Sequence, residues 1–247
     1  MRLEVLGGCG AWPTPDQACS GYLLEHAGFR VLLDPGYAVL PRLLARVPAE
    51  RVDAVLVSHG HPDHCADLNP LLRARALGAE PPAPLPVHAP PGALDAVLAL
   101  DGRMLADSYL LREFRPGSSF HIGPFTADTW ALPHFVPDAG FRLTAGGRVL
   151  GYTGDTGPSP GIAALAADAD VLLAEATFPE HVLPPEDAPL LSTARQAAES
   201  ASRAGVRHLV LTHLWPGTDP ADALRAARAE FDGDLDVATP GLTIDLG

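Results

Sequence analysis

The sequence predicts an α/β fold in which two mixed β-sheets pack face to face and are flanked by helices, a four-layer αββα sandwich. Short apolar strands alternate with helical segments in both halves of the chain. Hydrophobic residues make up 47% of the 247 residues, which is enough for a continuous core. A chain of this length suits one α/β domain, so we expect a single domain over residues 1–247.

Each expected strand is a short apolar run between turn residues. In chain order, the strands are expected at residues 3–6, 21–26, 30–33, 54–57, 85–88, 125–132, 140–144, 148–152, 171–174, 208–212, 235–238 and 242–245. The strand at 85–88 lies inside a proline-rich stretch, residues 80–91. We interpret this stretch as loop, strand and loop within one domain rather than as an interdomain linker.

The helices are predicted from apolar stripes and start signals. They are expected at residues 39–46, 67–77, 92–99, 161–167, 193–204 and 220–231. Thr193 and Gln196 have the spacing of a capping box, and the alanines at 194, 197, 198, 201 and 204 share one face of the helix that follows. Asp219 before Pro220 is a typical start for the last helix.

Charge and cysteine content narrow the functional classes. The formal net charge is −13, and all 17 basic residues are arginines. An acidic chain without a basic run is poorly suited to binding a long nucleic acid. No apolar run approaches a membrane span, and the N-terminus lacks the apolar segment of a signal peptide. Three cysteines are too few for a disulfide framework, so we expect a cytoplasmic protein that does not associate with membranes.

A histidine cluster, SHGHPDH at residues 58–64, follows one of the expected buried strands. Ligand sites in α/β folds lie beyond the carboxyl ends of strands. Residues two apart in an extended segment point the same way, so His59 and His61 are expected to converge on one metal ion. The proline that follows turns the chain, so Asp63 and His64 are expected to point toward a second ion.

Three further candidates stand where other strands end. His134, Asp155 and His213 each follow an apolar run directly or within two residues. With the cluster they supply seven ligands, about the number that two ions need when one carboxylate bridges them. Imidazole with carboxylate suits zinc, manganese or iron, and we expect two divalent ions, with zinc as the first choice.

These motifs, in this order, resemble the metallo-β-lactamase superfamily. The similarity runs from LGGCG near the N-terminus to LTHLWP near the end of the chain. It implies the αββα fold, with one metal held by His59, His61 and His134. The resemblance also implies that Asp63, His64 and His213 hold the second metal and that Asp155 bridges the two.

Such a pair of ions can share a hydroxide and stabilise charge on the attacking and leaving oxygens. Asp63 is expected to orient that hydroxide as well as to bind metal. Segments around Gly140-Phe141-Arg142, Tyr152–Thr156, Glu175–Phe178 and Ser192–Ala198 are similar to RNase Z and its phosphodiesterase relatives. An aspartate rather than a cysteine at position 155 disfavours a typical lactamase.

Two departures from the RNase Z pattern bear on the substrate. Only nine residues, Leu143–Gly151, stand where RNase Z enzymes that cut tRNA precursors carry an arm for gripping tRNA. Leu191 occupies the position before the S-T-A-R-Q segment, where relatives have a histidine thought to act as general acid. His181 is our candidate for a replacement proton donor, and an exposed loop histidine without a role is the alternative.

Further residues near the expected ligands in sequence are candidates for the substrate pocket: Phe135, Arg142, Thr156 and Trp215. Arg142 could bind a phosphate through two hydrogen bonds, or pair with surface carboxylates. Glu175 is expected either to hydrogen-bond a ligating histidine or to serve a loop.

The combined expectation is a dinuclear metal-dependent phosphodiesterase that acts on a small substrate such as a cyclic nucleotide. The alternatives are an RNase Z-like nuclease, another hydrolase of the superfamily such as a thioesterase or lactonase, and a catalytically weak metal-binding module. The expected partner is a small phosphodiester. Relatives of this family are often dimers, so a homodimer is compatible with the resemblance.

Overall fold

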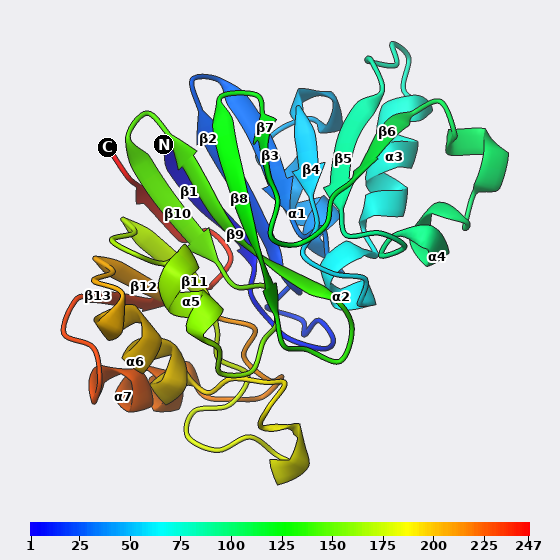
Figure 1. Ribbon diagram of the computed structural model, residues 1–247. Helices are drawn as coiled ribbons and strands as arrows, with labels where there is room; N and C mark the ends of the chain where they lie inside the picture. Colours follow the sequence, from blue (N-terminus) through cyan, green and yellow to red (C-terminus); the bar gives the residue numbers. More distant parts are fainter.

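The computed structural model describes residues 1–247 and contains two seven-stranded β-sheets packed face to face (Figure 1). The first sheet has the strand order β14-β1-β2-β3-β4-β5-β6. Its strands are β1 (Arg2–Gly7), β2 (Gly21–His26), β3 (Phe29–Leu33), β4 (Ala54–Leu56), β5 (Leu85–Ala89), β6 (Tyr109–Glu113) and β14 (Thr243–Asp245). Strands β3 to β6 run parallel, whereas β14, β1, β2 and β3 pair antiparallel, so the sheet is mixed.

The second sheet has the order β13-β12-β11-β10-β9-β8-β7. Its strands are β7 (Ser119–Ile122), β8 (Phe125–Leu132), β9 (Asp138–Ala145), β10 (Arg148–Tyr152), β11 (Val171–Glu175), β12 (His208–Thr212) and β13 (Asp234–Val237). Strands β10 to β13 are parallel, and β7 to β10 are joined antiparallel. This sheet is therefore also mixed.

Helices cover the outer face of each sheet, as Figure 1 shows. The helices are α1 (Val39–Leu44), α2 (Pro62–Cys65), α3 (Leu68–Ala76), α4 (Asp95–Leu98), α5 (Pro160–Leu165), α6 (Ala194–Arg203) and α7 (Pro220–Arg228), with short 3-10 turns at Ala49–Arg51, Gly102–Leu105 and Pro185–Asp187. Helices α1, α3 and α4 lie on the first sheet, and α5, α6 and α7 lie on the second. The predicted four-layer αββα sandwich is confirmed. None of the helices combines the length and apolar character needed to cross a membrane.

Three apolar layers hold the sandwich together. The layer between the sheets contains 24 buried residues, including Tyr22, Phe125, Phe141 and Tyr152. A layer of 20 buried residues lies under the helices of each sheet. Burial of apolar side chains at about 25 cal/mol per Å² makes these layers the main source of stability.

The structure adds two strands that sequence patterning did not predict, β6 and β7. Each is the edge strand of its sheet, and most of their residues are exposed or half-buried. An edge strand of this kind lacks the apolar alternation from which strands are predicted. The helix expected at residues 67–77 is preceded by the four-residue helix α2, which begins at Pro62.

Helix α6 begins as predicted from its capping box. The Thr193 side chain accepts a hydrogen bond from the Gln196 amide N–H, and the Gln196 side chain accepts one from the Thr193 amide N–H. The alanines of its stripe lie in the apolar layer under α6 and α7, where small side chains let the helices approach the sheet closely.

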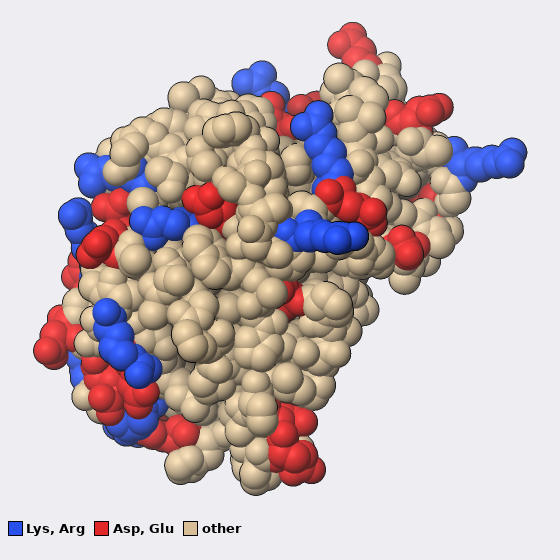
Figure 2. Space-filling model, in the orientation of Figure 1, with Lys and Arg blue, Asp and Glu red and all other residues tan.

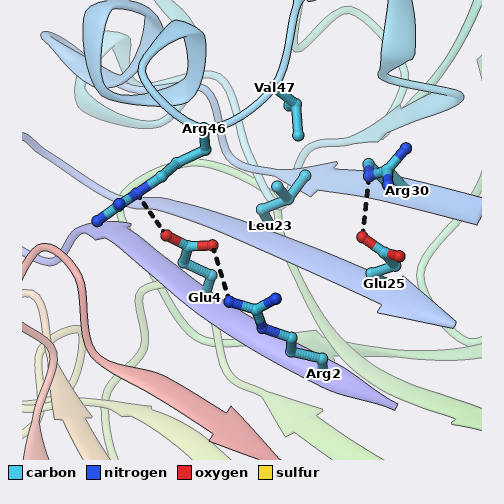
Figure 3. A pocket seen from close by; sticks show the side chains of 7 residues that line it. All are labelled: Arg2, Glu4, Leu23, Glu25, Arg30, Arg46 and Val47. Carbon is cyan, nitrogen blue, oxygen red and sulfur yellow. Dashed lines mark hydrogen bonds and ion pairs between the residues drawn. The ribbon is translucent and has the colours of Figure 1, made fainter. Parts of the chain in front are cut away.

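A pocket on the outer face of the first sheet is lined by alternating charges (Figure 3). Its volume is about 310 Å³, and its lining residues are Arg2, Glu4, Leu23, Glu25, Arg30, Arg46 and Val47. Glu4 pairs with Arg46 at 2.6 Å and with Arg2 at 3.7 Å, while Glu25 pairs with Arg30 at 2.9 Å. Because every guanidinium here has a carboxylate partner, the pocket is a network of partly exposed ion pairs, which stabilise a fold only weakly.

His88 makes the stability of the fold dependent on pH. Its ring stacks on Phe120 at 5.1 Å between centroids, and burial followed by the charge of Arg112 lowers its pKa from 6.5 to about 4. Folding therefore favours the neutral ring. The resulting stability is complete above pH 6.5 and is lost as the pH falls toward 4.

Lowering the pH from 7 to 5 should decrease the unfolding free energy of the wild type by about 2 kcal/mol more than that of His88→Phe. The reason is that the variant has no imidazole at this position to take up a proton on unfolding. Urea unfolding at both pH values measures the difference. His121→Phe, at an exposed position on β7, is the matched control and should follow the wild type. Equal losses in His88→Phe and the wild type would contradict the assignment.

Candidate metal centre

The parallel strands of both sheets, together with β8, end at one edge of the sandwich, near α2 in Figure 1, and the residues that follow them form the candidate site. His59 follows β4 by three residues, and His61, in an extended conformation, immediately precedes α2. Helix α2 then turns the chain, so that Asp63 and His64 lie on its first turn. The second sheet contributes the residues after β8, β10 and β12, which are His134, Asp155 and His213.

These residues form two adjoining groups of candidate ligands. In the first group, His61 Nδ1 lies 3.1 Å from His59 Nε2 and 3.1 Å from His134 Nε2. Asp155 Oδ2 completes the group at 3.7 Å from the Nε2 atoms of His59 and His134. All four ligand atoms lie within 4.8 Å of one another.

The second group shares Asp155 with the first. Asp155 Oδ1 lies 3.2 Å from His64 Nε2, and Asp155 Oδ2 lies 3.0 Å from His213 Nε2. Asp63 Oδ2 is 3.2 Å from His213 Nε2 and 3.7 Å from His64 Nε2. The structure thus brings all seven predicted metal ligands together and places Asp155 between the two groups.

The donor atoms fit divalent metal ions. Two nitrogen or oxygen ligands bound tetrahedrally at 2.0–2.1 Å from zinc are about 3.3 Å apart. The pairs of donor atoms described above lie 3.0–3.7 Å apart, and no two donor atoms in a group are more than 4.8 Å apart. His64 Nε2 and Asp155 Oδ1 are buried without a hydrogen-bond partner in the chain. Buried polar atoms normally have a partner, so these two atoms indicate a group held between them.

A second set of contacts fixes how the histidine rings are turned. His64 Nδ1 lies 2.8 Å from Asp34 Oδ2, and His213 Nδ1 lies 3.0 Å from the Thr177 hydroxyl. His134 Nδ1 lies 3.1 Å from the Leu190 carbonyl oxygen. Each of these rings can donate a proton from Nδ1 while Nε2 faces the metal site, which is the usual arrangement of metal-binding histidines.

Two side chains lie close to the Nδ1 atom of His59. The Ser58 hydroxyl lies at 3.0 Å, and Asp138 Oδ1 lies at 3.1 Å. Asp138 is the first residue of β9 and is almost fully buried. Burial and then the neighbouring charge of Asp155 raise the pKa of Asp138 well above its usual value.

Asp34 is the most densely bonded of the supporting residues. Its carboxylate accepts hydrogen bonds from the Ser58 amide N–H at 2.7 Å, the Ser58 hydroxyl at 2.6 Å and the Tyr152 hydroxyl at 2.6 Å, besides its contact with His64. Asp34 has a positive φ of 48° and is completely buried. It connects the end of β3 with the segment after β4 and with β10 of the other sheet.

Glu175 supports the second group of ligands indirectly, through the hydroxyl of Thr177. It accepts a 2.6 Å hydrogen bond from the Thr177 hydroxyl, which contacts His213, and it also accepts hydrogen bonds from the amides of Thr156 and Ser192. Burial and then the charge of Asp155 raise the pKa of Glu175 to about 8. Glu175 therefore reaches the ligating histidine through a hydroxyl rather than directly, and it also orders two loops.

The electrostatics of the metal-free site follow from burial and close charges. Burial and then the charge of His64 lower the pKa of His59 well below its usual value. Burial alone would lower the pKa of His64, but Asp155 and Asp63 raise it well above the usual value. Burial would raise the pKa of Asp155, but His213 and His64 lower it well below the usual value. Asp155 is therefore a carboxylate, the form that binds a cation.

The loop between β1 and β2 closes one side of the site. The Ala11 amide N–H donates a 2.8 Å hydrogen bond to Asp63 Oδ2, and a Cβ atom at Gly10 would lie 2.8 Å from the His213 ring. Glycine at position 10 therefore lets the backbone pass directly over His213. His213 itself has a positive φ of 59°, a conformation that non-glycine residues adopt mainly where the surroundings enforce it.

The four residues predicted to bind substrate divide into two pairs. Phe135 and Trp215 lie beside the ligands and are 50% and 38% exposed, and the Phe135 ring lies 5.2 Å from the His134 ring. Thr156 is buried, and its hydroxyl donates to the Gly157 carbonyl at 2.7 Å. Arg142 donates to the carbonyls of Leu165 and Ala167 at 2.9 and 2.7 Å.

Thr156 and Arg142 are therefore placed differently from the prediction. The Thr156 hydroxyl is satisfied inside the protein. Arg142 projects from the outer face of β9 onto the end of α5, four residues, or about 13 Å, along the strand from Asp138. Nearness in sequence to the metal-ligand segments does not carry these two side chains to the open face of the site.

His181, the predicted proton donor, and Leu191, which stands where relatives have the general-acid histidine, lie on neighbouring segments. His181 is exposed in the loop after β11. Leu191 is 8% exposed and directly follows Leu190, whose carbonyl oxygen contacts His134. A bridge between Phe178 and Thr193 places the two segments side by side.

Asp34, Asp138, Ser58 and Thr177 are supporting residues that sequence reasoning did not identify. Asp34 directly follows an expected strand, as several of the predicted ligands do. This position was the one feature of the sequence that could have identified it as part of the site. Cys65, the last residue of α2, packs in the apolar layer on the outer face of the first sheet and is not among the candidate ligands.

Comparison with known proteins agrees with this geometry. Residues 29–214 match the family described as the beta-lactamase superfamily domain. The chain is 31% identical over 245 residues to the "Probable metallo-hydrolase YhfI" of Bacillus subtilis, covering 98% of each chain. It is 31% identical to a ribonuclease Z of Kineococcus radiotolerans, covering 96% of this chain and 94% of the relative.

Solved structures show the same fold over the whole length. The crystal structure of Bacillus subtilis YhfI, a metallo-beta-lactamase fold protein, superposes with a TM-score of 0.89 at 28% identity and 99% coverage of both chains. The short form of human tRNase Z superposes with a TM-score of 0.82 at 24% identity and complete coverage of both chains. Together with the paired His/Asp groups, these similarities show that the chain belongs to the metallo-β-lactamase superfamily and is a metallo-hydrolase of that superfamily.

Proposed function

We propose that the protein is a dinuclear metal-dependent phosphodiesterase that hydrolyses a small substrate such as a cyclic nucleotide. The observation that carries the proposal is the pair of adjoining ligand groups that share Asp155. His59, His61 and His134 would hold one divalent ion, and Asp63, His64 and His213 the other, with Asp155 between them. Zinc is our first choice, and the same ligands suit manganese or iron.

Two such ions supply Lewis-acid activation of water and offset the charge of a phosphodiester. Asp63 has a further role in the proposal. Its Oδ2 atom makes hydrogen bonds with the Ala11 amide N–H and with His213 Nε2, whereas no hydrogen bond within the chain involves Oδ1. Oδ1 is therefore available to accept a hydrogen bond from the attacking water and to orient it. Asp34 and Ser58 orient the rings of His64 and His59 through their Nδ1 atoms.

Two observations favour a small phosphodiester over a long RNA. The turn between β9 and β10 consists of Gly146 and Gly147 alone, so no arm extends from this position. The comparison with the Kineococcus ribonuclease Z spans 298 positions, more than the 247 residues of this chain, so the relative carries insertions that this chain lacks.

The distribution of surface charge also favours a small substrate over a long RNA. On the face shown in Figure 2, the arginines are scattered and many lie beside acidic groups, without a continuous basic stripe. A protein that binds a long polyanion gains most of its affinity from such a stripe.

The leaving oxygen needs a proton when the substrate is a cyclic nucleotide. Leu191 cannot supply one. We include His181 as the donor because its loop lies beside the segment that contains Leu191. The substrate side of the site would be lined by Phe135 and Trp215.

The test is hydrolysis by the metal-loaded protein of 3′,5′-cyclic AMP, bis(p-nitrophenyl) phosphate, a precursor tRNA and a thioester. We expect turnover of the first two, loss of turnover with a chelator, and its return with zinc or manganese. If only the precursor tRNA were cleaved, an RNase Z-like nuclease would be favoured. If only the thioester were hydrolysed, a thioesterase would be favoured.

His181→Ala separates the role of the proton donor from that of the metal site. We expect it to slow cyclic AMP hydrolysis about a hundredfold and to leave bis(p-nitrophenyl) phosphate hydrolysis nearly unchanged, since nitrophenolate leaves without a proton. Equal effects on both substrates would remove His181 from the mechanism without affecting the metal assignment.

A further inference from the structure

Three aromatic residues from separate segments, two of them exposed and one half-buried, meet beside the candidate metal centre. We call Trp12, Phe178 and Trp215 the aromatic cluster. The Trp12 and Trp215 rings meet edge to face with centroids 5.2 Å apart. The Phe178 ring stacks on Trp215 at 5.7 Å with an angle of 20° between the planes. Trp12 is 50% exposed and Trp215 is 38% exposed.

Short contacts attach each member of the cluster to the second group of ligands. Trp12 follows Ala11, whose amide N–H donates to Asp63. Phe178 follows Thr177, whose hydroxyl contacts His213. Trp215 is two residues beyond His213, and its amide N–H donates to the Thr177 carbonyl oxygen at 2.9 Å.

These attachments fix the cluster close to the ligands. Two residues of chain reach at most about 7 Å, so the Trp215 backbone lies within this distance of His213. That separation is comparable with the span from phosphate to base in a mononucleotide.

Packing alone does not explain the cluster. The apolar layers of the fold are formed by other residues, and none of the three rings belongs to them. Large exposed aromatic groups cost hydration free energy, and grouped exposure of this kind is typical of binding sites. The exposed ring of Phe135 stands beside His134, so aromatic faces adjoin ligands of both groups.

We propose that the aromatic cluster binds the nucleobase of the substrate by stacking, while the phosphodiester lies at the metal centre. Trp12 is then a specificity residue that distinguishes nucleotides from phosphodiesters without a base. Aromatic side chains stack on any base because each base has a π-face, so the cluster selects for a planar ring rather than for one base. This proposal rests on the proposed phosphodiesterase function, since it names the part of the substrate that the metals do not bind.

Binding can be measured without turnover, because two of the three tryptophans of the chain belong to the cluster. The metal-loaded protein is titrated with AMP and with ribose 5-phosphate while tryptophan fluorescence is recorded. We expect AMP to quench the emission, and ribose 5-phosphate, which lacks the base, to bind at least about tenfold more weakly and with little quenching.

Variants at Trp12 and at the remaining tryptophan sharpen the test. Trp12→Ala should weaken AMP binding about ten- to a hundredfold and leave ribose 5-phosphate binding unchanged, and Trp12→Phe should restore most of the affinity. Trp130→Phe is the matched control, because Trp130 is half-buried and packs against the apolar layer under α5 to α7. It should retain the AMP-dependent quenching.

The kinetic counterpart distinguishes this proposal from the proposed function. With cyclic AMP, Trp12→Ala should raise KM by the same factor as it weakens AMP binding, with kcat little changed. Hydrolysis of cyclic AMP with equal binding of AMP and ribose 5-phosphate would overturn the role of the cluster and retain the phosphodiesterase. Trp12-dependent binding of AMP in a protein that hydrolyses no phosphodiester would support the cluster and overturn the enzymatic function.

Discussion

Replacing Asp155 by alanine is expected to lower the kcat for phosphodiester hydrolysis on the order of a thousandfold or more and to reduce the bound metal below two ions per chain. Asp155 is the one side chain that contributes to both ligand groups. Its Oδ1 faces His64, and its Oδ2 faces His213, His59 and His134. Without the carboxylate, the remaining imidazoles would have to hold two neighbouring cations with less negative charge between them.

Metal analysis of the purified variant, together with turnover of bis(p-nitrophenyl) phosphate, measures both effects. Asp155→Asn keeps the shape of the side chain and isolates the contribution of its charge. Asp232→Asn, an exposed aspartate in the loop after α7, is the matched control and should retain two ions and full activity. Two tightly bound ions in Asp155→Ala would show that Asp155 does not bridge them.

Replacing Asp34 by alanine is expected to have the largest effect on stability, lowering the unfolding free energy of the metal-free protein by about 3–5 kcal/mol. The Asp34 carboxylate satisfies the Ser58 amide, the Ser58 hydroxyl, the Tyr152 hydroxyl and His64. All of these groups are buried, so removal of their shared acceptor leaves donors without partners. Metal affinity should also fall about ten- to a hundredfold, because His64 loses the contact that orients it.

Urea unfolding of the metal-free protein measures the first effect, and competition with a chelator measures the second. Tyr152→Phe removes one of the four contacts and should cost only about 1 kcal/mol. Asp34→Asn tests the charge separately, since asparagine tolerates the positive φ of this position. A loss of less than 1 kcal/mol in Asp34→Ala would show that water replaces the carboxylate.

The sequence is a good guide to the fold where residues are buried. Strands such as β2, β8, β10 and β12 have the bounds expected from their apolar runs. Edge strands β6 and β7 were not predicted, because an edge strand needs no apolar face to be stable once its partner is in place. Their existence depends on hydrogen bonds to β5 and β8, which are contacts between segments rather than properties of a segment.

The clustering of the candidate metal ligands could be predicted because most of their pattern is local. Three histidines and an aspartate within six residues are rare, and each distant partner stands at a strand end. The supporting residues have no such pattern. Asp34 and Asp138 resemble any other acidic residue next to a strand, and their role appears only when β3 and β9 bring them to His64 and His59.

Side chains predicted from nearness in sequence were the least dependable. Arg142 and Thr156 are close in sequence to the metal-ligand segments, but alternation along β9 and the bonding of the loop after β10 turn them elsewhere. Trp12 is far in sequence from every candidate ligand, and the loop after β1 brings it to Trp215. Whether a segment forms a helix or a strand depends mainly on its own residues. The direction in which a side chain points depends more on the tertiary fold.

The division of the ligands between the two sheets makes the centre a cross-link as well as a reaction site. His59, His61, Asp63 and His64 come from the first sheet, whereas His134, Asp155 and His213 come from the second. Neither half of the chain contains a complete set of ligands for either ion, so a fragment that ends between β6 and β7 would have no complete ion site. If the proposed ions bind there, ion binding and the docking of one sheet on the other form a single linked equilibrium, and each ion would stabilise the contact between the two halves.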